Sequence, residues 1–397
     1  MKAFSRRFLI KDGIIIKKNN GKSYRLPTEL EQRIHLYSLE FNFECLGNEF
    51  MQFLIKEGII DECSETYDPY VVDSKEYQNV RLFIQLTGNC NLKCRHCFLG
   101  GSAQENNFYN YKRITKVVDE AVKHGISRID FTGGEITTIT FLDKLISYLD
   151  SKPIQYIFFT NLAFVDKKIL NSMAKAIGLA RIITSIDYFT AAKHDSFRGK
   201  KGAFESTYHN VIELYKKGIN ITINTMVLKD NHEDIKKMID YFIPMGIGMH
   251  FDTVIQKGNA VLNKEILEEN PDESIDFIYE CMEYVKRNYG IDIDVDMTSC
   301  GVGKTLLYLD KDGMFQLCPG LTSRESEIFY LGKTLEDAFG QLQKFDLCCE
   351  DRNCEFYLKC NFGCREKAFF NFGSINAPDK AVCSLLKREI KSGEIDN

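Results

Sequence analysis

The chain has 397 residues, of which 44% are hydrophobic and 27% charged, so it can form two or three domains with a buried core. A net charge of −5 gives no basic field that would favour nucleic acid. The start lacks a signal-peptide pattern, and no stretch approaches the roughly 18 apolar residues of a membrane span. We therefore expect a cytoplasmic protein without a nucleic-acid or membrane partner. Fourteen cysteines in that compartment favour metal or cluster ligation over disulfide bonds.

Residues 1–79 are expected to form a small leading domain. Asn20-Gly21 is a tight-turn pair, which predicts a β-hairpin over 13–26. Helical patterns follow at 30–39 and 47–56, and a short strand is predicted at 58–60. Cys45 and Cys63 lie in this segment without obvious partners, and we expect them to be ordinary thiols.

Three cysteines follow the first strand of the next segment, which is predicted at 80–86. Cys90, Cys94 and Cys97 have the spacing C-x3-C-x2-C, so their thiolates can face one inorganic cluster. An iron–sulfur cubane normally has four cysteine ligands, so three leave one iron open to a small molecule. A zinc site with His96 as the fourth ligand is the alternative.

Residues 80–290 alternate between predicted strands and amphipathic helices. The strands are predicted at 80–86, 128–132, 155–160, 181–186, 220–226 and 248–254. The helices are predicted at 114–123, 141–149, 167–176, 204–217, 234–242 and 273–287, with a further helical piece at 261–269. Six strand–helix units of short period indicate parallel strands joined by crossover helices.

Polar motifs follow several of these strands. Gly133-Gly134-Glu135 comes directly after the second strand, where glycines allow a close backbone approach and Glu135 can accept hydrogen bonds from an ammonium group. Asn161 follows the third strand. Ser185 and Asp187 alternate onto one face of the fourth, where they suit ribose hydroxyls or an ammonium group. Buried polar strand residues need partners, and for Asn224 in the fifth strand the candidates are a ligand or a neighbouring loop.

These motifs together resemble the radical S-adenosylmethionine (SAM) superfamily. The resemblance implies an α/β fold, a partial (β/α)6 TIM-like barrel with its chemistry at the carboxyl ends of the strands. It also implies a [4Fe–4S] cluster at Cys90, Cys94 and Cys97, whose open iron takes the amino and carboxylate groups of SAM. Gly133-Gly134-Glu135 is similar to the family's Gly-Gly-Glu-Pro motif, with Ile136 in place of proline. The implied cofactor contacts are Phe98, Gly133, Gly134, Glu135, Asn161, Ser185, Asp187 and Arg198.

Residues 291–397 hold eight cysteines and resemble the SPASM domain, the auxiliary-cluster extension of many radical SAM enzymes. That resemblance implies two auxiliary iron–sulfur clusters, which we expect to be [4Fe–4S]. One would take Cys300, Cys318 and Cys364, with Cys348 as fourth ligand or an open iron for a substrate thiolate. The other would take Cys349, Cys354, Cys360 and Cys383. The sequence departs from the family pattern at Asp351, where the family has a cysteine, so Cys349, Cys348 or an Asp351 oxygen must substitute. Zinc binding is the alternative.

Arg198 lies in His194-Asp195-Ser196-Phe197-Arg198-Gly199, which resembles a stretch of radical SAM peptide maturases in which arginine pairs with the SAM carboxylate. The leading domain resembles winged-helix-like domains that bind a leader peptide, with a plain cap domain as the alternative. The resemblance implies a maturase whose 5′-deoxyadenosyl radical removes hydrogen from a ribosomally made peptide, forming a thioether or carbon–carbon cross-link. Its partners would be a precursor peptide with a leader segment and an electron donor, flavodoxin or ferredoxin. No side-chain acid or base need be catalytic.

Two other functions remain open at this point. A sulfatase-maturating enzyme, which forms formylglycine, is disfavoured because Pro319 and Gly320 follow Cys318, where those relatives carry an aspartate. A non-catalytic iron–sulfur protein for electron transfer or redox sensing would not need Gly133-Gly134-Glu135 or the polar residues at the strand ends. The domain boundaries we expect are 1–79, 80–290 and 291–397.

Overall fold

A computed structural model describes residues 2–11, 14–26, 48–62, 80–100, 109–266, 271–291, 300–345, 347–356, 360 and 362–391. The helix predicted at 30–39 and the thiols Cys45 and Cys63 lie outside the described residues. Within these ranges no helix has both the length and the apolar character to span a membrane.

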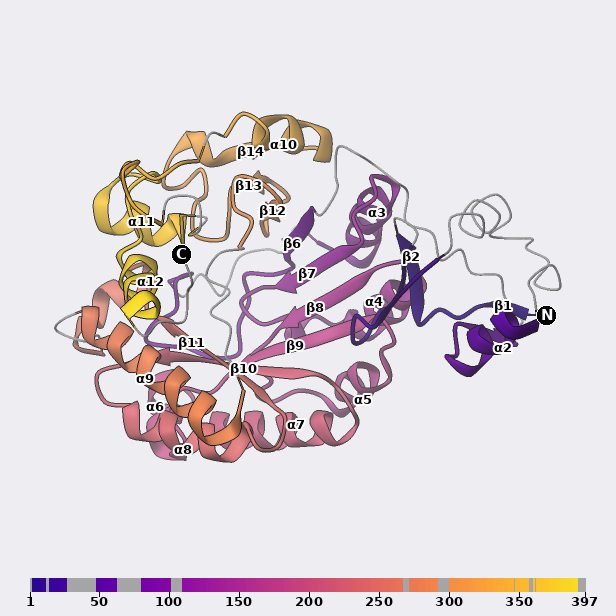
Figure 1. Ribbon diagram of the computed structural model, residues 1–397, viewed down its shortest axis with the longest axis horizontal. Helices are drawn as coiled ribbons and strands as arrows, with labels where there is room; N and C mark the ends of the chain where they lie inside the picture. The colour runs from indigo at the N-terminus through magenta and orange to yellow at the C-terminus, as the bar shows by residue number, and fades with distance from the viewer. Residues whose placement is uncertain are drawn as a thin grey trace.

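Six parallel strands form the centre of the molecule (Figure 1). In spatial order they are β6 (Arg81–Gln85), β7 (Arg128–Thr132), β8 (Gln155–Phe159), β9 (Leu179–Ser185), β10 (Ile221–Val227) and β11 (Gly248–Thr253), each paired in parallel with the next. The predicted strands agree with these within two residues. β10 shows why the pattern worked, because its residues alternate between buried and partly buried along its whole length. The α/β fold class is confirmed, and the curved parallel sheet is compatible with a partial barrel.

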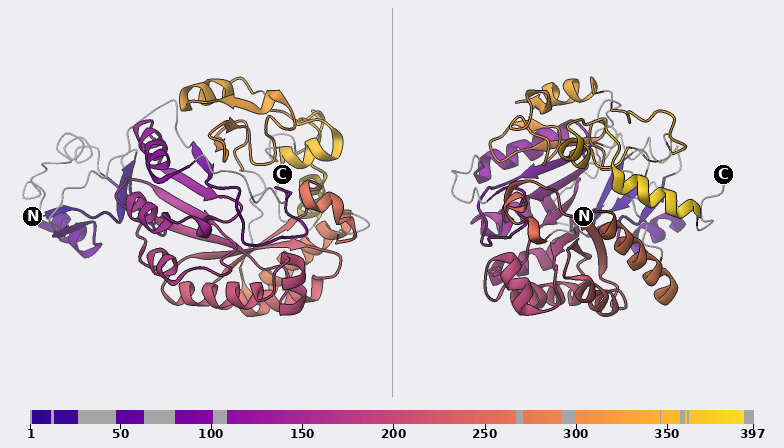
Figure 2. Two further views of the ribbon diagram at one scale, coloured as in Figure 1. Left: turned by 180° about the vertical axis from the view of Figure 1, so that it is seen from behind. Right: turned by 90° about the vertical axis from the view of Figure 1, so that its left-hand side faces the viewer.

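Helices cover the outer face of this sheet (Figures 1 and 2). They are α3 (Tyr111–Lys123), α4 (Leu142–Asp150), α5 (Lys167–Lys175), α7 (Ala203–Lys216), α8 (His232–Phe242) and α9 (Pro271–Tyr289). One further helix, α6 (Ala191–Arg198), was missed because its sequence was interpreted only as a motif. The helical piece predicted at 261–269 is wrong in type, because two short 3-10 turns lie there: η3 (Gly258–Leu262) and η4 (Lys264–Ile266). Another 3-10 turn, η2 (Ile136–Thr138), follows β7.

The leading segment forms two small sheets at the amino ends of the central strands. β2 (Phe8–Lys11), β3 (Ile14–Lys17) and β4 (Ser23–Arg25) are antiparallel, and β1 (Lys2–Phe4) pairs with β5 (Ile60–Glu62) beside α2 (Asn48–Lys56). The buried Lys18 Nζ donates to the carbonyl oxygens of Lys152, at 2.6 Å, and Asp150, at 3.4 Å, just before β8. The three-stranded sheet is thereby anchored to the central domain at the end opposite the loops that follow the strands.

The C-terminal segment continues the central sheet rather than forming a separate one. β12 (Leu306–Leu309) pairs in parallel with β6, and β13 (Phe315–Gln316) and β14 (Tyr330–Gly332) add antiparallel strands, with η5 (Glu327–Phe329) between them. α10 (Leu335–Leu342), α11 (Arg365–Phe372) and α12 (Lys380–Lys391) follow. In Figure 1 this segment arches over the carboxyl ends of the strands, and α12 packs against α9. The C-terminal segment and the six central strands therefore share one nine-stranded sheet.

Candidate cluster and cofactor site

The three leading cysteines lie in the loop after β6 and line one pocket. Cys90, Cys94 and Cys97 share that pocket with the backbone that follows β7. Two hydrogen bonds tie the cysteine loop to the end of α6: Lys93 N donates to Arg198 O at 3.0 Å, and Arg95 N to Phe197 O at 2.9 Å. Residues from three separate elements thus converge at the carboxyl edge of the sheet.

The buried thiols carry unusual electrostatics. Burial raises the pKa of Cys90 to about 12 and also raises the pKa of Cys94, where the nearby Arg198 guanidinium opposes the rise. Arg198 Nη1 lies 3.7 Å from the Cys94 sulfur. Thiols of this kind stay protonated unless a positive group binds them, and a metal centre supplies that charge by taking them as thiolates.

Gly133 and Gly134 bring the loop after β7 against the cysteine loop. A Cβ on Gly134 would lie 2.6 Å from the carbonyl oxygen of Gly88 and closer still to that of Asn89. Gly134 N donates to Thr87 O at 2.8 Å, and Glu135 N to Asn89 O at 2.7 Å. Only glycine permits this approach, so both glycines line the pocket as backbone.

The Glu135 side chain has a different place from the one we predicted. It is 1% exposed, and Oε1 accepts hydrogen bonds from Thr160 Oγ1 at 2.5 Å and from Thr137 N at 2.9 Å. Oε2 accepts from Asn161 N at 2.6 Å. With these partners the carboxylate joins the ends of β7 and β8 instead of facing the pocket.

Asn161, Ser185 and Phe98 do line the pocket. Asn161 Nδ2 donates to Asn91 Oδ1 at 2.9 Å and lies 4.0 Å from the Cys90 sulfur, so it also holds the cysteine loop. Asp187 differs from our prediction of a cofactor contact. It is fully buried, and its Oδ2 accepts from Arg198 Nε at 2.7 Å and Nη2 at 2.5 Å. Asp187 therefore positions the Arg198 guanidinium, which itself lines the pocket.

Two further polar side chains reach the pocket with an unpaired atom. Asn224 Oδ1 and His96 Nδ1 are buried and have no hydrogen-bond partner within the described part of the chain. The His96 ring stacks on Phe197 with centroids 4.6 Å apart, and burial lowers its pKa well below the usual value. Buried polar groups are normally paired, so a ligand in the pocket could form the hydrogen bonds that these two atoms lack.

Asn259 was missed by sequence reasoning. Its backbone N donates to Cys97 O at 2.9 Å, its Nδ2 donates to Cys94 O at 2.9 Å, and it lines the pocket. Asn263 Nδ2 donates to Arg95 O at 3.2 Å. The segment that contains η3 therefore binds three carbonyl groups of the cysteine loop. The available signal was the position of Gly258-Asn259 shortly after the sixth strand, at the edge where the other motifs gather.

The C-terminal cysteines separate into two groups. Cys349, Cys354, Cys360 and Cys383 surround one small pocket, together with Asp351. Burial, together with the charges of Asp379 and the other three cysteines, raises the pKa of Cys383 to about 11. This is the set that the SPASM resemblance implied for one auxiliary cluster.

The set implied for the other auxiliary cluster is only partly gathered. Burial raises the pKa of Cys318, and the nearby charges of Glu366 and Cys364 raise it further. Cys300 is exposed, and its carbonyl accepts from Arg81 at 3.0 Å. The backbone N of Cys348 donates a hydrogen bond to Asn376 Oδ1 at 3.3 Å. Among the described contacts, none joins the Cys300 or Cys348 thiol to Cys318 or Cys364.

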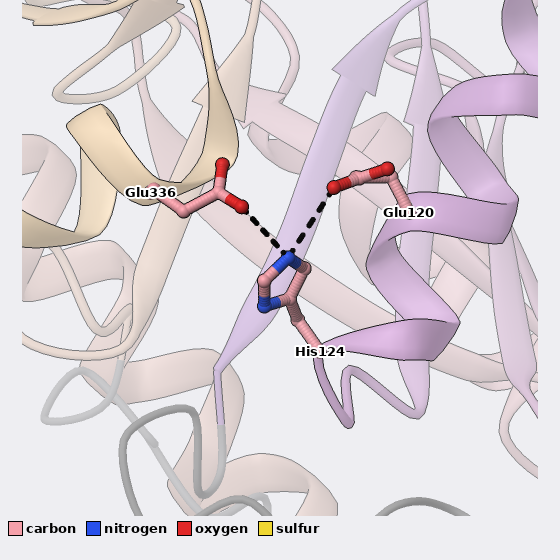
Figure 3. Close-up of side chains that lie close together, drawn as sticks. All are labelled: Glu120, His124 and Glu336. Atoms are coloured by element: carbon pink, nitrogen blue, oxygen red, sulfur yellow. Dashed lines mark hydrogen bonds and ion pairs between the residues drawn. The ribbon is translucent and has the colours of Figure 1, made fainter.

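The spacing of these thiols does not suit a single metal ion. Thiolates around one zinc ion lie about 3.8 Å apart, given a Zn–S bond of about 2.3 Å. In the part of the chain that the structure describes, one group of three His, Cys, Asp or Glu ligand atoms lies within 4.8 Å of one another: Glu120, His124 and Glu336. Figure 3 shows these side chains joining α3 to α10, with His124 Nε2 at 3.3 Å from Glu120 and 3.1 Å from Glu336. None of the cysteine groups is that compact.

A [4Fe–4S] cluster and SAM fit the residues of the first pocket. The fit rests on three thiols that line one pocket, the glycine backbone at its edge and the unpaired atoms of Asn224 and His96. The second group of four cysteines likewise fits a polynuclear cluster.

Residues 84–242 match the model of the radical SAM superfamily. The chain therefore contains a radical SAM domain, for which a [4Fe–4S] cluster and SAM are implied.

Three comparisons extend beyond that domain. The AdoMet-dependent heme synthase of Nitratidesulfovibrio vulgaris is 25% identical over 350 residues, covering 77% of this chain and 92% of the relative. The subtilosin biosynthesis protein AlbA of Bacillus subtilis is 24% identical over 331 residues, covering 77% and 70%. The crystal structure of Streptococcus suis SuiB bound to precursor peptide SuiA superposes with a TM-score of 0.62 at 17% identity, covering 96% of this chain and all of SuiB. Other curated relatives are matched over about half of their length, 49% in one case.

Proposed function

We propose that this chain is a maturase that modifies a ribosomally synthesised peptide and forms a thioether or carbon–carbon cross-link between side chains. The observation that carries the proposal is the fold of the whole chain, which matches SuiB, a protein solved with its precursor peptide, over 96% of its length. The relationship to AlbA, a bacteriocin biosynthesis protein, supports the same substrate class.

When bound at Cys90, Cys94 and Cys97, the cluster and SAM supply a 5′-deoxyadenosyl radical that removes a hydrogen atom from an unactivated carbon. The protein's part is binding and exclusion of water. Gly133 and Gly134 offer backbone to the cofactor, while Arg198, fixed by Asp187, offers its guanidinium to the SAM carboxylate. Asn224 offers an unpaired buried oxygen, which can accept a hydrogen bond from the amino or ribose groups.

We propose two auxiliary iron–sulfur clusters in the C-terminal segment, one of them at Cys349, Cys354, Cys360 and Cys383. They would accept the electron left after cross-linking or hold a substrate sulfur. The leading sheet would bind the leader of the precursor peptide by strand addition. A flavodoxin or ferredoxin would supply electrons in the cytoplasm.

A tetrapyrrole-modifying enzyme is the second candidate, because the heme synthase relative is matched over 92% of its length. Formylglycine formation on a protein is less well supported, since Cys318 is followed by Pro319 and Gly320. The non-catalytic iron–sulfur protein is less well supported, because the chain contains a radical SAM domain.

Co-expression with a candidate precursor peptide, sought among short open reading frames near its gene, tests the proposal. We expect the peptide to become lighter by the mass of two hydrogen atoms per cross-link, and a Cys94→Ala variant to leave it unchanged. Purified enzyme that removes carboxyl groups from a porphyrin substrate, and leaves every peptide unmodified, would contradict the peptide assignment.

A further inference from the structure

One buried carboxylate beside the C-terminal cysteines has no role in the account so far. Glu366 is the second residue of α11, and Cys364 stands at the N-cap of that helix. The turn after β13, which carries Cys318 and Gly320, lies against it. A Cβ on Gly320 would overlap the carboxyl group of Glu366, so the glycine makes the space that this carboxylate fills.

Glu366 Oε1 is buried without a hydrogen-bond partner among the described residues. The other acidic groups of this region are paired. Asp252 accepts from Lys367 Nζ at 2.6 Å, and Glu325 accepts from Lys257 Nζ at 2.7 Å and from Thr322 Oγ1 at 2.7 Å. A buried carboxylate oxygen without a partner costs free energy, so the arrangement implies a ligand that the oxygen can reach.

The chemistry next to Glu366 points to a metal centre. Glu366 follows Cys364 by two residues, and its carboxyl group lies against Gly320, two residues after Cys318, so the two thiols and the carboxylate belong to one small region. Burial raises the pKa of Glu366, and the charges of Lys257 and Lys367 oppose that rise. Two thiolates and a carboxylate are a set of anionic metal ligands, and the two lysines offset their combined charge.

The ligand count for this centre is otherwise short. Cys300 is exposed beside Arg81, and the Cys348 backbone is held at Asn376. We propose that Glu366 is an oxygen ligand of the first auxiliary iron–sulfur centre, which it shares with Cys318 and Cys364. The proposal rests on the auxiliary clusters of the proposed function and assigns a ligand that the cysteine pattern does not supply.

An oxygen ligand gives one iron of this centre a spectrum that differs from the spectra of the thiolate-bound irons. Carboxylate is a harder ligand than thiolate and binds iron less firmly in a sulfur cluster. The iron bound by Glu366 is therefore the first to be lost when the ligand is weakened, and its electronic environment differs from that of the thiolate-bound irons.

The test uses the full chain with Cys90, Cys94 and Cys97 changed to alanine, so that iron binds at the auxiliary sites alone. This protein and its Glu366→Gln and Glu366→Cys variants are reconstituted anaerobically with isotopically enriched iron and examined by Mössbauer and EPR spectroscopy. Glu325→Gln is the matched control, because Glu325 lies in the same region but already has protein partners. Circular dichroism checks that each variant is folded.

We expect the parent to show one oxygen-bound iron site. Relative to the parent, Glu366→Gln should lose about one iron from that centre, while Glu366→Cys should keep that iron and replace the oxygen-bound signal with a sulfur-bound one. Glu325→Gln should match the parent. Unchanged spectra in both Glu366 variants, or a parent that binds no auxiliary iron, would overturn the proposal. SAM cleavage by the chain with intact Cys90, Cys94 and Cys97 is measured separately, so a failed ligand assignment is distinguishable from a failed enzyme assignment.

Discussion

Glu135 and Asp187 are charged residues at the pocket edge whose side chains bind the protein itself. Glu135 joins Thr137, Thr160 and Asn161, and Asp187 holds Arg198. Burial raises the pKa of Asp187, and the Arg198 guanidinium opposes that rise. At the scale of single residues, the pocket is thus lined by glycine backbone, the Arg198 guanidinium and the amides of Asn161, Asn224 and Asn259.

The first prediction concerns the close approach at Gly134. In Gly134→Ala the new Cβ would collide with the Gly88 and Asn89 carbonyls, so the two loops must separate. We expect at least about a tenfold loss of SAM affinity, the effect of about 1.4 kcal/mol, measured by equilibrium binding to the reconstituted enzyme.

Gly340→Ala is the control for that substitution. Gly340 lies inside α10, and a Cβ there meets nothing within 4 Å. Alanine should stabilise the helix by about 0.5–1 kcal/mol and leave SAM affinity unchanged. Equal SAM affinity in Gly134→Ala and Gly340→Ala would contradict the role given to Gly134.

The second prediction follows from the buried His194. Burial, together with the Arg198 charge, lowers its pKa to about 2. Its Nδ1 accepts a hydrogen bond from Asp187 N at 3.3 Å, which requires the unprotonated nitrogen. Below about pH 6.5 the unfolded chain binds a proton at this histidine that the folded chain does not, so stability falls as pH decreases.

Urea unfolding of the chain without metal, between about pH 7 and pH 5, measures this effect. His194 should contribute a decrease of up to about 1.4 kcal/mol per pH unit in the free energy of unfolding. His194→Gln should remove that part of the slope, while His209→Gln, at an exposed site, should not. An unchanged slope in His194→Gln would show that this histidine does not stay neutral in the fold.

At the scale of elements, the cysteine loop is held by α6 and η3, two segments that lie far from it in the sequence. The end of α6 binds the backbone of Lys93 and Arg95, and η3 binds the carbonyls of Cys94 and Cys97 through Asn259. The loop has no regular secondary structure of its own, so these contacts determine how well it keeps a cluster.

The third prediction tests the hydrogen bond between Asn259 and the cysteine loop. Asn259→Leu leaves the Cys94 carbonyl without its side-chain donor, at a cost of about 1–3 kcal/mol. We expect iron to be released to a chelator at least several-fold faster. Leu262→Ala is the control in the same η3 segment, because Leu262 is 81% exposed. Equal release rates in the two variants would argue against a supporting role for Asn259.

At the scale of the whole molecule, the leading sheet and the C-terminal segment lie at opposite ends of the central strands (Figures 1 and 2). Lys18 anchors the leading sheet at the amino ends, whereas β12 to β14 extend the central sheet and carry α11 to the carboxyl ends. A peptide bound by the leading sheet would therefore have to pass along the outside of the barrel to reach the pocket.

The fourth prediction concerns this anchor. Lys18→Met removes the donor to the Lys152 and Asp150 carbonyls, at a cost of about 1–3 kcal/mol for buried acceptors left without a partner. We expect the leading segment to be cleaved at least about tenfold faster in limited proteolysis, with the SAM affinity unchanged. Lys22→Met is the control, because Lys22 pairs with Glu57 inside the leading segment. Equal cleavage of both variants would mean that Lys18 does not hold the sheet.

Much of the architecture could be predicted because it depends on local patterns. Apolar alternation located all six parallel strands, and the cysteine spacing placed Cys90, Cys94 and Cys97 in one loop. Thr160 and Asn161 bind Glu135, Arg198 binds Asp187, and Gly320 lies against Glu366. These contacts come from other elements, so no local pattern could show whether the three carboxylates face a ligand or the protein. The extension of the sheet by β12 depends on its pairing with β6, 225 positions earlier for Leu306 and Arg81, and was missed for the same reason.

The central claim is that Cys90, Cys94 and Cys97 hold the cluster at which SAM is cleaved. The most direct measurement is the amount of 5′-deoxyadenosine formed when the anaerobically reconstituted enzyme is given SAM and dithionite. We predict its formation in the parent enzyme and its absence in Cys94→Ala with the auxiliary iron still bound. Formation of 5′-deoxyadenosine at the same rate by Cys94→Ala, or none by a parent enzyme with all its clusters in place, would contradict the claim.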